Sequence, residues 1–527
     1  MKKRYRVIDT TDSHEQKMDN PYDRIPYLGR SHQQTHIEKI ACIPFLFDIP
    51  FPDVHHARVL ELGCGDGSNI LNMAYSLPNA TFVGIDGSEV QITRGQESIS
   101  ITGISNLELF HCDLLDVDSS FGTFDYIICH GVYSWVPSHV RKTILQICSQ
   151  RLSTNGIAYI SYNALPGWRM YSMVREMMRY HVRHIREDHK KTEQSIAMLQ
   201  FVGQHLVDPV DSYGAFIRET MEHLSHSTSE YIFHEYLEEN NQAFYFHEFI
   251  DSLEEHNLQY LGNTDFNTMN NLHFPEETQN ILDEISNNIH NLEQYMDFLR
   301  CRRFRCDLLT HNNRELAREV TLNPFTKGYF TLSAFHAQDE NLTPKDIFED
   351  ILENIFIESQ QKALKDIPIF AHTIQSLFEH WPQYVHFDDI CSYVQNRTMD
   401  FSQGDKVEIA ALLQTLLLRN TIDLHLFQPK IATEVSHRPC ASLVARAQIR
   451  YQFSISNQHH TMVALKDIWM RKILPYIDGK HTFEELFSIM QGFVHEDPSL
   501  HEQEASFHKA KLREFLSILL QKGVLVS

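Results

Sequence analysis

Basic residues are scarce in this sequence. Its 46 lysines and arginines stand against 69 aspartates and glutamates, so the 527-residue chain has a formal net charge of −23. The phosphate backbone of a nucleic acid repels such a chain, because nucleic-acid binding depends largely on Lys and Arg. An anionic membrane surface is disfavoured for the same reason. We therefore expect no nucleic-acid partner.

Long apolar runs are absent as well. No stretch approaches the roughly 20 consecutive apolar residues that cross a bilayer, so we expect no membrane insertion. The N-terminal segment MKKRYRVIDTTDSHEQK has basic residues but lacks the apolar core of a secretory signal peptide. The nine cysteines are scattered and odd in number, which does not suit a disulfide framework. These absences predict a cytoplasmic location, although export by a route without a cleaved signal stays open.

Signatures of metal sites and of nucleophilic hydrolases are also missing. The sequence contains neither H-E-x-x-H nor G-x-S-x-G. Cys301, Cys306 and His311 stand near one another, but their spacing fits no common zinc pattern and a fourth ligand is not evident. We expect no metal, and we interpret residues 301–311 as part of a helical core.

The pattern of apolar residues divides the chain into four parts. Residues 1–56 are interpreted as lead-in helices and a lid. Residues 57–168 alternate strand-like and helix-like segments, which is typical of a parallel sheet with helices on both faces. The strand candidates in this part are residues 57–62, 81–86, 107–113, 124–130 and 156–162.

The remaining sequence changes character twice. Residues 169–325 have a mostly helical pattern. Residues 326–527 predict an α+β, winged-helix-like region, because residues 409–427 and 512–527 each combine an amphipathic helix, a turn and a short β-branched run. Since the chain is acidic, we expect packing or protein contacts from this region rather than DNA binding.

A glycine-rich turn ends the first strand candidate. The segment VLELGCGDG, residues 59–67, contains Gly63, Gly65 and Gly67. Glycines between a strand and a helix permit positive φ angles and let a ligand touch the backbone. A dinucleotide fingerprint would need a third glycine where Ser68 stands, and the phosphate-binding G-x-x-x-x-G-K-[ST] is absent. The turn therefore suits close approach of a ligand but is not marked for a pyrophosphate.

Acidic residues stand at the ends of three successive strand candidates: Glu61, Asp86 and Asp113. The carboxyl ends of parallel strands meet at one edge of a sheet, where α/β proteins bind their ligands. Glu61 suits a positively charged group, and Asp86 is placed to bind ribose hydroxyls. Asp113, with the amide of Leu114, could read the edge of an adenine, or it could be a plain helix N-cap. S-adenosylmethionine, a sulfonium joined to an adenosine, meets these demands.

Residues 57–162 resemble the class I S-adenosylmethionine-dependent methyltransferases, which have a Rossmann-like sheet. VLELGCGDG resembles the first motif of this family, VGIDGS the second, CDLLD the third and FDYIICHGVYSWV the fourth, with matching order and spacing. In the family, the glycines pack on the methionine moiety, the second-motif acid binds the ribose and the third motif binds the adenine. The cofactor contacts implied within these four motifs are Glu61, Gly63, Gly65, Gly67, Asp86, Gly87, Ser88, Asp113, Leu114 and His130.

The resemblance extends to methyltransferases that carry a regulatory domain. This bacterial group includes the rickettsial protein-lysine methyltransferases that modify outer-membrane proteins. The segments PYDRIPY, HGVYSWVP, YNALPGW and YIFHEYLEENNQAFYFHEFI are similar to this group. The resemblance implies that Tyr22, Tyr27 and Gln34 help to close over the cofactor. It also implies that residues 169–325 form a regulatory or dimerisation-type domain with elements that complete the sheet, which leaves a homodimer open.

The residues after the fourth strand candidate bear on the methyl acceptor. The segment HGVYSW lacks the [DN]-P-P-[YF] tetrad that holds planar amides and exocyclic amines, which argues against DNA and glutamine substrates. Tyr133, Trp135, Tyr162 and Trp168 are candidates for an acceptor pocket, although Tyr133 and Trp135 could instead be core aromatics. An aromatic pocket favours a neutral amine by desolvation and binds a methylated ammonium by cation–π contact.

The sequence therefore predicts an S-adenosylmethionine-dependent methyltransferase that acts on a protein side chain, with lysine as the preferred acceptor and S-adenosylhomocysteine as the product. The large regions beyond residue 168 suit a macromolecular acceptor. Two alternatives remain: a small-molecule O- or N-methyltransferase, and a scaffold that binds the cofactor without catalysis.

Overall fold

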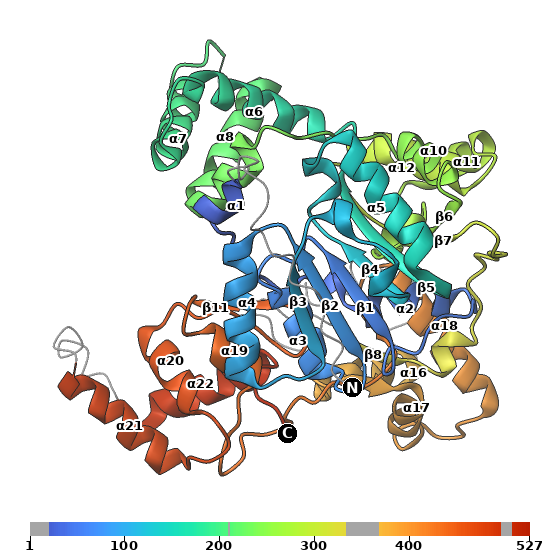
Figure 1. The fold of residues 1–527 in the computed structure, drawn as a ribbon. Coiled ribbons are helices and arrows are strands. Elements are labelled where there is room, and N and C mark those ends of the chain that lie inside the picture. The colour runs from blue at the N-terminus through green and yellow to red at the C-terminus, as the bar shows by residue number, and fades with distance from the viewer. Residues whose placement is uncertain (1–19, 209–210, 334–367, 497–508) are drawn as a thin grey trace.

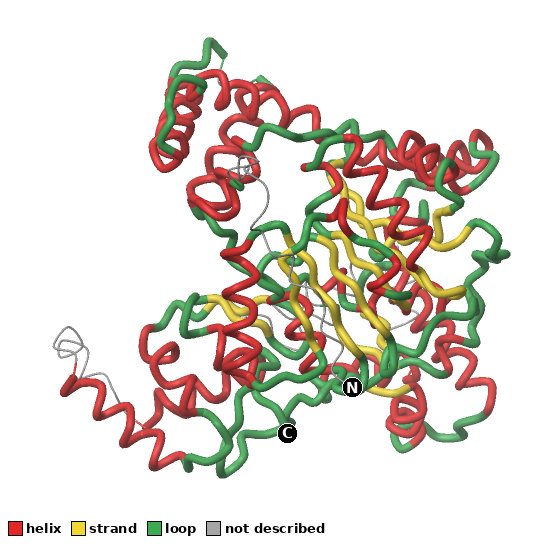
Figure 2. Tube along the Cα trace, viewed as in Figure 1, coloured by secondary structure: helices red, strands yellow, loops and turns green. Residues whose placement is uncertain are grey.

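A seven-stranded sheet forms the centre of the molecule. The computed structural model describes residues 20–208, 211–333, 368–496 and 509–527. The strand order is β3-β2-β1-β4-β5-β7-β6, and β7 is antiparallel to both of its neighbours (Figures 1 and 2). The strands are β1 (Arg58–Leu62), β2 (Thr81–Asp86), β3 (Leu107–His111), β4 (Phe124–Cys129), β5 (Leu152–Asn163), β6 (Leu258–Asn263) and β7 (Phe304–His311).

The central strands β1, β2 and β4 are largely buried on both faces, as their continuous apolar runs predict, whereas the edge strand β3 is exposed on one face. In β1, Val59 packs into one apolar cluster and Leu60 into another on the opposite face, because successive side chains of a strand alternate. Helices α3 (Ser68–Ser76) and α4 (Glu89–Thr102) contribute to the first cluster, and α5 (Ser138–Arg151) contributes to the second. The predicted α/β fold with helices on both faces is confirmed.

The strand order reverses at β1, which pairs with β2 on one side and β4 on the other. In open α/β sheets a crevice forms at such a reversal, outside the carboxyl ends of the strands. The segments that follow β1, β2 and β4 therefore converge at one edge of the sheet.

A helical lobe follows the parallel strands and extends away from the end of the sheet (Figure 1). The lobe consists of α6 (Trp168–Val182), α7 (Asp188–Gln204) and α8 (Ser212–Ser225). The chain then returns to the sheet through α9 (Ser229–Ile232), a π-helical segment (Phe233–Leu237), α10 (Phe246–Glu254), β6, α11 (Glu276–Ile285), α12 (Ile289–Arg300) and β7. A region with a mostly helical sequence pattern thus supplies two strands of the main sheet.

The interpretation of residues 301–311 as helical core is wrong, because most of this segment forms β7. Cys306 and Leu308 pack on one apolar cluster, whereas Arg305 and Asp307 face the opposite side and pair there. Side chains that alternate with a period of two define a strand. Within the described parts of the chain, no group of three His, Cys, Asp or Glu side chains is placed to hold a metal.

The C-terminal region contains two compact units in which a helix is followed by a short strand. The first holds the three-stranded sheet β10-β8-β9. Its elements are β8 (Tyr329–Leu332), α16 (Pro368–Glu379), β9 (Val385–His386), α17 (Phe387–Gln395), α18 (Gln403–Leu418) and β10 (Ile422–His425). The second consists of α19 (Leu443–Gln448), β11 (Ser454–Ser456), β12 (Met462–Ala464), α20 (Ile468–Ile473), α21 (Phe483–Glu496) and α22 (Lys509–Gln521). The expected winged-helix-like pattern is confirmed, while residues 334–367 and 497–508 lie outside the described ranges.

The N-terminal lead-in joins the sheet to the C-terminal region. It contains α1 (Pro21–Arg24), a 3-10 turn (Gln33–Thr35) and α2 (Ile37–Leu46), and residues 1–19 lie outside the described ranges. From α2, Lys39 Nζ forms an ion pair of 2.6 Å with Asp423 of β10. The lead-in helix α2 therefore packs against the first unit of the C-terminal region.

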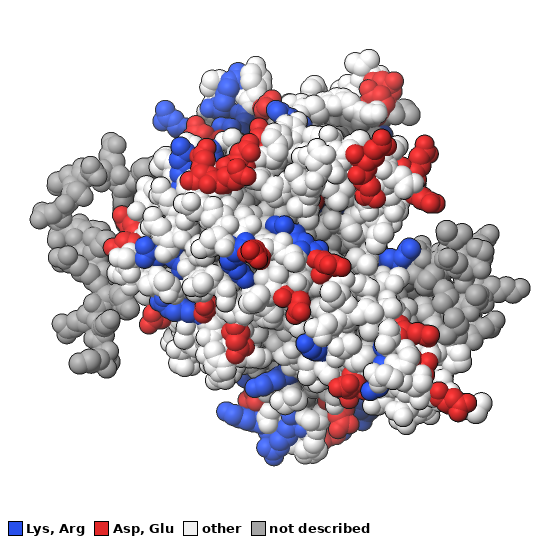
Figure 3. Space-filling view, turned by 90° about the vertical axis from the view of Figure 1, so that its right-hand side faces the viewer, with Lys and Arg blue, Asp and Glu red and all other residues white. Residues whose placement is uncertain are grey.

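The surface carries both signs of charge. On the face shown in Figure 3, Lys and Arg side chains are interspersed with Asp and Glu. Among the described residues, no helix combines the length and the apolarity that a bilayer crossing requires.

One buried arginine links β7 to α12. Arg305 is fully buried and pairs with Asp307 at 3.0 Å, with Asp297 at 2.8 Å and with Glu293. The Tyr162 hydroxyl donates to Asp307 at 2.7 Å and joins the same network. Removing one partner from a buried ion network leaves the other charges uncompensated, which costs about 3–5 kcal/mol.

We expect Arg305→Met to lower the free energy of unfolding by about 3–5 kcal/mol, because three buried carboxyl groups lose their cation. Lys142→Met is the matched control, since Lys142 is exposed on α5 and should change stability by no more than about 0.5 kcal/mol. Chemical denaturation followed by circular dichroism measures both variants. Equal losses in the two variants would show that the network contributes no stability.

Candidate active site

The glycine turn after β1 has the backbone that its sequence predicts. Gly63, Gly65 and Gly67 all have φ between 56° and 71°, in the left-handed region. A Cβ on Gly63 would lie 2.4 Å from the Val132 side chain, whereas a Cβ on Gly65 would meet nothing within 4 Å. The turn is therefore closed on its β4 side and open at Gly65, where a ligand can reach the backbone.

Asp86, at the end of β2, holds this turn in place. Its two carboxylate oxygens accept hydrogen bonds of 2.8 Å, one from the Gly65 amide and one from the Ser88 amide. Burial raises the pKa of Asp86. The carboxylate thus connects the glycine turn to the N-terminus of α4 and remains at the wall of the cavity that the turn forms.

Glu61 is the most unusual carboxylate of the site. It is 4% exposed, its Oε1 accepts a 2.7 Å hydrogen bond from Asn69 Nδ2, and its buried Oε2 has no partner among the described residues. Burial raises the pKa of Glu61 to about 8, and the nearby charges of Asp86 and Asp66 add to the effect. An unsatisfied buried carboxylate in this place fits a positively charged amino group, such as the one on the methionine part of S-adenosylmethionine.

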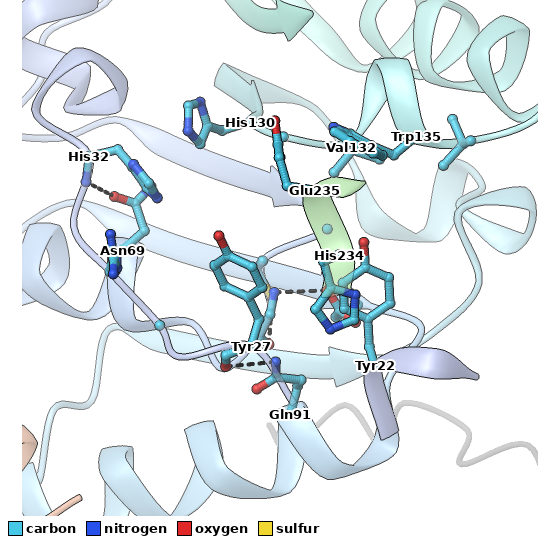
Figure 4. Close-up of a pocket in the computed structure, with 18 of the residues that line it drawn as sticks. Tyr22, Tyr27, His32, Asn69, Gln91, His130, Val132, Trp135, His234 and Glu235 are labelled. Carbon is cyan, nitrogen blue, oxygen red and sulfur yellow. Dashed lines mark hydrogen bonds between the residues drawn. The ribbon is translucent and has the colours of Figure 1, made fainter. Parts of the chain in front are cut away.

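A segment of the lead-in crosses this edge of the sheet. We call residues 20–32 the strap. Asn20 Nδ2 donates to the Gly87 carbonyl at 3.0 Å, and Gln91 Nε2 donates to the Tyr27 carbonyl at 2.9 Å (Figure 4). At Gly29 the strap runs so close that a Cβ would lie 1.9 Å from Asp66 Oδ1. The strap therefore forms one wall of the cavity and borders the glycine turn at Gly29.

His234, in the π-helical segment, fixes the two tyrosines of the strap. Its ring stacks on Tyr22 with centroids 4.3 Å apart and an interplanar angle of 2°, and Tyr27 lies 5.7 Å away (Figure 4). One ring nitrogen of His234 contacts the Ile25 carbonyl at 2.7 Å and the other contacts Glu238 at 2.9 Å. Burial raises the pKa of Tyr27 to about 12, so the Tyr27 hydroxyl stays protonated.

These elements enclose a cavity of about 730 Å³. Most of the residues predicted from the sequence line it, so that strap, glycine turn and strand ends converge as expected. The predicted residues on its wall are Tyr22, Tyr27, Glu61, Gly63, Gly65, Asp86, Gly87, Asp113, Leu114, His130, Trp135 and Trp168.

Two of these lining residues have structural contacts as well. Asp113 Oδ1 accepts from the Leu115 amide at 2.9 Å, so Asp113 is an N-cap and also a lining residue. The His130 ring lies 4.2 Å from the His32 ring, and its Nδ1 contacts the Tyr159 hydroxyl at 2.9 Å. Burial lowers the pKa of His130 well below its usual value, so His130 is neutral.

Five predicted site residues are not among the residues that line the cavity. Gly67 and Ser88 are the N-caps of α3 and α4. Gln34 lies in the 3-10 turn beyond the strap. The buried Tyr133 packs against Phe244 and Phe249, and Tyr162 belongs to the Arg305 network. The side chains of Tyr133 and Tyr162 thus contribute to the core, as the alternative interpretation of Tyr133 foresaw.

The two predicted tryptophans mark the far end of the cavity. Trp135 and Trp168 meet edge to face with centroids 6.2 Å apart, and Tyr171 stacks on Trp168 at 5.6 Å. Trp168 Nε1 donates to Asn241 at 2.8 Å. Trp135, Trp168 and Tyr171 therefore give this part of the cavity a mostly aromatic wall.

Sequence reasoning missed several residues that line the cavity. They are Arg30, Asn69, Tyr171, Tyr231, Glu235 and Tyr236, together with His234. Residues 231–250 resemble the regulatory-domain group, but this resemblance does not predict a cavity role for any single residue in the segment. The run FHEY, with a histidine and a glutamate between aromatic residues, was the signal that could have identified His234 and Glu235.

The charge on Glu61 gives a prediction for ligand binding. Glu61→Gln should weaken binding of S-adenosylhomocysteine about 10- to 100-fold, because a charge-assisted hydrogen bond is worth about 1.5–3 kcal/mol. Titration calorimetry measures the affinity. Glu108→Gln, on an exposed position of β3, is the matched control and should bind as the unchanged protein does. Unaltered affinity in Glu61→Gln would remove Glu61 from the ligand contacts.

The same substitution should change how stability depends on pH. The pKa of Glu61 rises from 4.5 to about 8 on folding, so the folded chain binds more protons than the unfolded chain between these values. The ligand-free protein therefore loses stability as pH rises through this interval. Glu61→Gln should lack this loss, which urea denaturation at several pH values between 5 and 9 would detect.

Comparisons with known families match three parts of the chain. Residues 53–241 match a methyltransferase domain, and residues 228–311 match a predicted methyltransferase regulatory domain. Residues 437–524 match the C-terminal winged helix domain of PKMT proteins. The first match contains the glycine turn, Asp86 and both tryptophans, and the second contains His234 and Glu235.

Two relatives and one solved structure extend these matches. The uncharacterized protein RP789 of Rickettsia prowazekii (strain Madrid E) is 42% identical over 90% of this chain and 86% of its own length. RP028 of the same organism is 40% identical over 44% of this chain and 94% of its own length. PKMT2 from Rickettsia typhi is 28% identical, covers 95% of this chain and 100% of its own, and has a TM-score of 0.77. That protein has also been solved in complex with AdoHcy, and the TM-score is then 0.78.

The cavity beside the glycine turn, the unpaired Glu61 and the matches along the chain agree with one another. The chain belongs to the class I S-adenosylmethionine-dependent methyltransferases that carry a methyltransferase regulatory domain and a PKMT-type C-terminal winged helix domain.

Proposed function

We propose that this chain methylates a side-chain amine of a protein, with lysine as the acceptor. The observation that carries the proposal is Glu235, a carboxylate on the wall of an otherwise mostly aromatic part of the cavity. In Figure 4, Tyr22 and His234 lie on one side of the cavity, His130 and Trp135 on the other, and Glu235 between them. Arg303 also lines the cavity and acts on Glu235, but the aromatic rings and the carboxylate together suit a cationic amine rather than a hydroxyl or a carboxylate acceptor.

The surroundings of Glu235 support this assignment. Burial raises the pKa of Glu235 to about 7, although Arg175 and Arg303 partly oppose the shift. Tyr231 and Tyr236 line the cavity beside it, and their own pKa values are raised by burial and by the charge of Glu235. The carboxyl group can therefore hold or release a proton near neutral pH.

Arg175 places Glu235 relative to the tryptophans. Its guanidinium donates to the carbonyls of Glu235 and Glu238 and lies 5.0 Å from the centre of the Trp135 ring. Because Arg175 is buried on α6, these contacts fix the π-helical segment against the helical lobe. The geometry of the amine site thus depends on two elements that follow the methyltransferase sheet in the chain.

The chemistry of such a reaction follows from the two ends of the cavity. S-adenosylmethionine supplies a methyl group on a positively charged sulfonium, which departs as a neutral thioether. Glu61 and the glycine turn hold and orient the donor. Glu235 first pairs with the acceptor ammonium and then takes one of its protons, so that the nitrogen lone pair is free to form the new N–C bond as the C–S bond breaks. The aromatic rings exclude water and stabilise the methylated ammonium that results.

A labelling experiment tests the proposal. We expect the protein, incubated with S-adenosylmethionine carrying a radiolabelled methyl group and a lysate of its own cells, to label protein bands in a base-stable form. Acid hydrolysis should release the label as methyllysine. Label confined to the small-molecule fraction would instead favour a small-molecule methyltransferase. Binding of the cofactor without transfer to any fraction would favour a scaffold.

Glu235→Gln should lower kcat/KM for the protein acceptor by roughly 10²-fold or more, as the loss of a proton acceptor does, and leave the affinity for S-adenosylhomocysteine unchanged. Activity of the unchanged protein should rise with pH through about 7, because Glu235 becomes ionised there. The variant should lack this rise. Glu239→Gln, exposed four residues further on, is the matched control. A pH profile that is the same in both variants would exclude Glu235 as the proton acceptor.

The exposed apolar side chains of the lobe α6–α8 support the homodimer that the sequence leaves open. Tyr180, Phe201 and Val207 are 67%, 60% and 105% exposed, which is unusual for large apolar side chains on one lobe. We propose that this part of residues 169–325 is the dimer contact. Light scattering should give twice the chain mass, and Phe201→Glu should reduce it to the monomer. The four-part domain division and the cytoplasmic location stay predictions.

A further inference from the structure

A hairpin turn of the C-terminal region reaches the helix that follows the glycine turn. Residues 457–461, which connect β11 to β12, form this hairpin turn. Asn72 of α3 donates to the Asn457 carbonyl at 3.0 Å and contacts His460 Nδ1 at 3.1 Å. His460 Nε2 lies 2.8 Å from Asn69 Oδ1. Since Asn69, Asn72, Asn457 and His460 are each no more than 5% exposed, these contacts are shielded from water.

The contacts determine how the His460 ring is protonated. Asn69 Oδ1 can only accept, so the proton sits on His460 Nε2, and Nδ1 accepts from Asn72. Burial, with His36 and His32 nearby, lowers the pKa of His460 well below its usual value, so the ring is neutral. The His460 backbone has φ of 58°, a left-handed conformation that directs the ring into α3.

The side-chain amide of Asn69 accepts hydrogen bonds through its oxygen and donates them through its nitrogen. Its oxygen accepts from His460 Nε2 and, at 3.0 Å, from the His32 amide of the strap. Its nitrogen donates to Glu61 Oε1 at 2.7 Å and to Thr35 Oγ1 at 2.8 Å. A flipped amide would set its oxygen against the Glu61 carboxylate and its NH₂ against two donors. The donors on the oxygen side therefore keep the nitrogen side toward Glu61.

The hairpin also holds the strap directly. The Ser31 and Ser456 hydroxyls are 2.7 Å apart, and Gln452 Nε2 lies 3.4 Å from the Gly29 carbonyl. Gly29 borders Asp66, and Arg30 and His32 line the cavity. The second winged unit thus touches two walls of the cofactor cavity without lining it.

We propose that His460 is a positioning residue for the cofactor: it orients the Asn69 amide, which in turn holds Glu61 toward the amino group of S-adenosylmethionine. No contact between His460 and the cofactor is involved, since His460 does not line the cavity. The charged groups that face Glu61 are Asp86 and Asp66, so Asn69 is the neutral donor that steadies it. The inference concerns cofactor binding and is independent of the identity of the methyl acceptor.

A regulatory consequence follows from linkage. If the contact between residues 457–461 and α3 strengthens cofactor binding, then bound cofactor strengthens this contact by the same factor. A partner that binds the second winged unit and draws residues 457–461 away from α3 would weaken cofactor binding to the same extent. The C-terminal unit is therefore able to control the cofactor site from outside it.

The test uses two substitutions of His460 in the full chain. His460→Asn keeps a polar residue that tolerates left-handed backbone, but its side chain is too short to reach Asn69. His460→Gln is longer and keeps an N–H donor. Titration calorimetry with S-adenosylhomocysteine should show affinity about 5- to 30-fold weaker in His460→Asn and largely restored in His460→Gln. Thermal unfolding confirms that each variant is folded.

Two controls separate positioning from general damage. His459→Asn alters the neighbouring histidine, which stacks on Trp381 and makes no contact with Asn69, and it should bind the ligand normally. In a Glu61→Gln background, His460→Asn should have little further effect, because the group that it positions is already changed. An equal loss in both backgrounds, or unchanged affinity in His460→Asn, would overturn the proposal. If the unchanged protein binds S-adenosylhomocysteine but methylates no protein acceptor, the proposed function is contradicted and this inference, which concerns ligand affinity alone, still stands.

Discussion

Three acidic residues, the buried Glu61 and the half-buried Asp66 and Asp86, lie close together at one edge of the sheet, and the rest of the site depends on this constraint. Burial raises the pKa of each, and Asp86 and Asp66 add to the shift at Glu61. Backbone amides satisfy Asp86, and the Ser88 amide is one of them. Asn69 donates a hydrogen bond to Glu61 Oε1, and Glu61 Oε2 is available to a cation. A cationic group of the cofactor would therefore pair with the Glu61 oxygen that Asn69 does not contact.

Apart from Tyr22 and Tyr27 of the strap, which the family resemblance implied, the predicted residues that line the cavity lie at or just after the ends of strands in a continuous βα pattern. Once the strands are parallel, their carboxyl ends must meet, so Glu61, Asp86 and Asp113 follow from local pattern alone. Asn69, Glu235 and His460 could not be found in this way. Glu235 and His460 belong to segments that are remote in sequence from the strand ends. The position of Asn69 at the cavity depends on which face of α3 points toward Glu61.

The aromatic candidates show the same limit at closer range. Trp135 and Trp168 line the cavity, while Tyr133 and Tyr162, each within six residues of a tryptophan, pack in the core. Whether each aromatic side chain lines the cavity or packs in the core depends on the direction in which the chain leaves β4 and β5. The aromatic character of these residues is compatible with either position. In β7, Arg305 can be buried because Glu293 and Asp297 of α12 face it, and this pairing was not visible when residues 301–311 were interpreted as helical core. A partner on another element cannot be read from local sequence.

The contact between Ser31 of the strap and Ser456 of the hairpin has a consequence for synthesis of the chain. A ribosome produces the glycine turn, the strands and the strap long before it produces residues 457–461. The strap can already contact Gly87, Gln91 and His234 at that stage, but its contact with Ser456 and the contact of Asn69 with His460 require the hairpin. The cofactor cavity therefore has its full set of supporting contacts only once residues 457–461 have folded against α3.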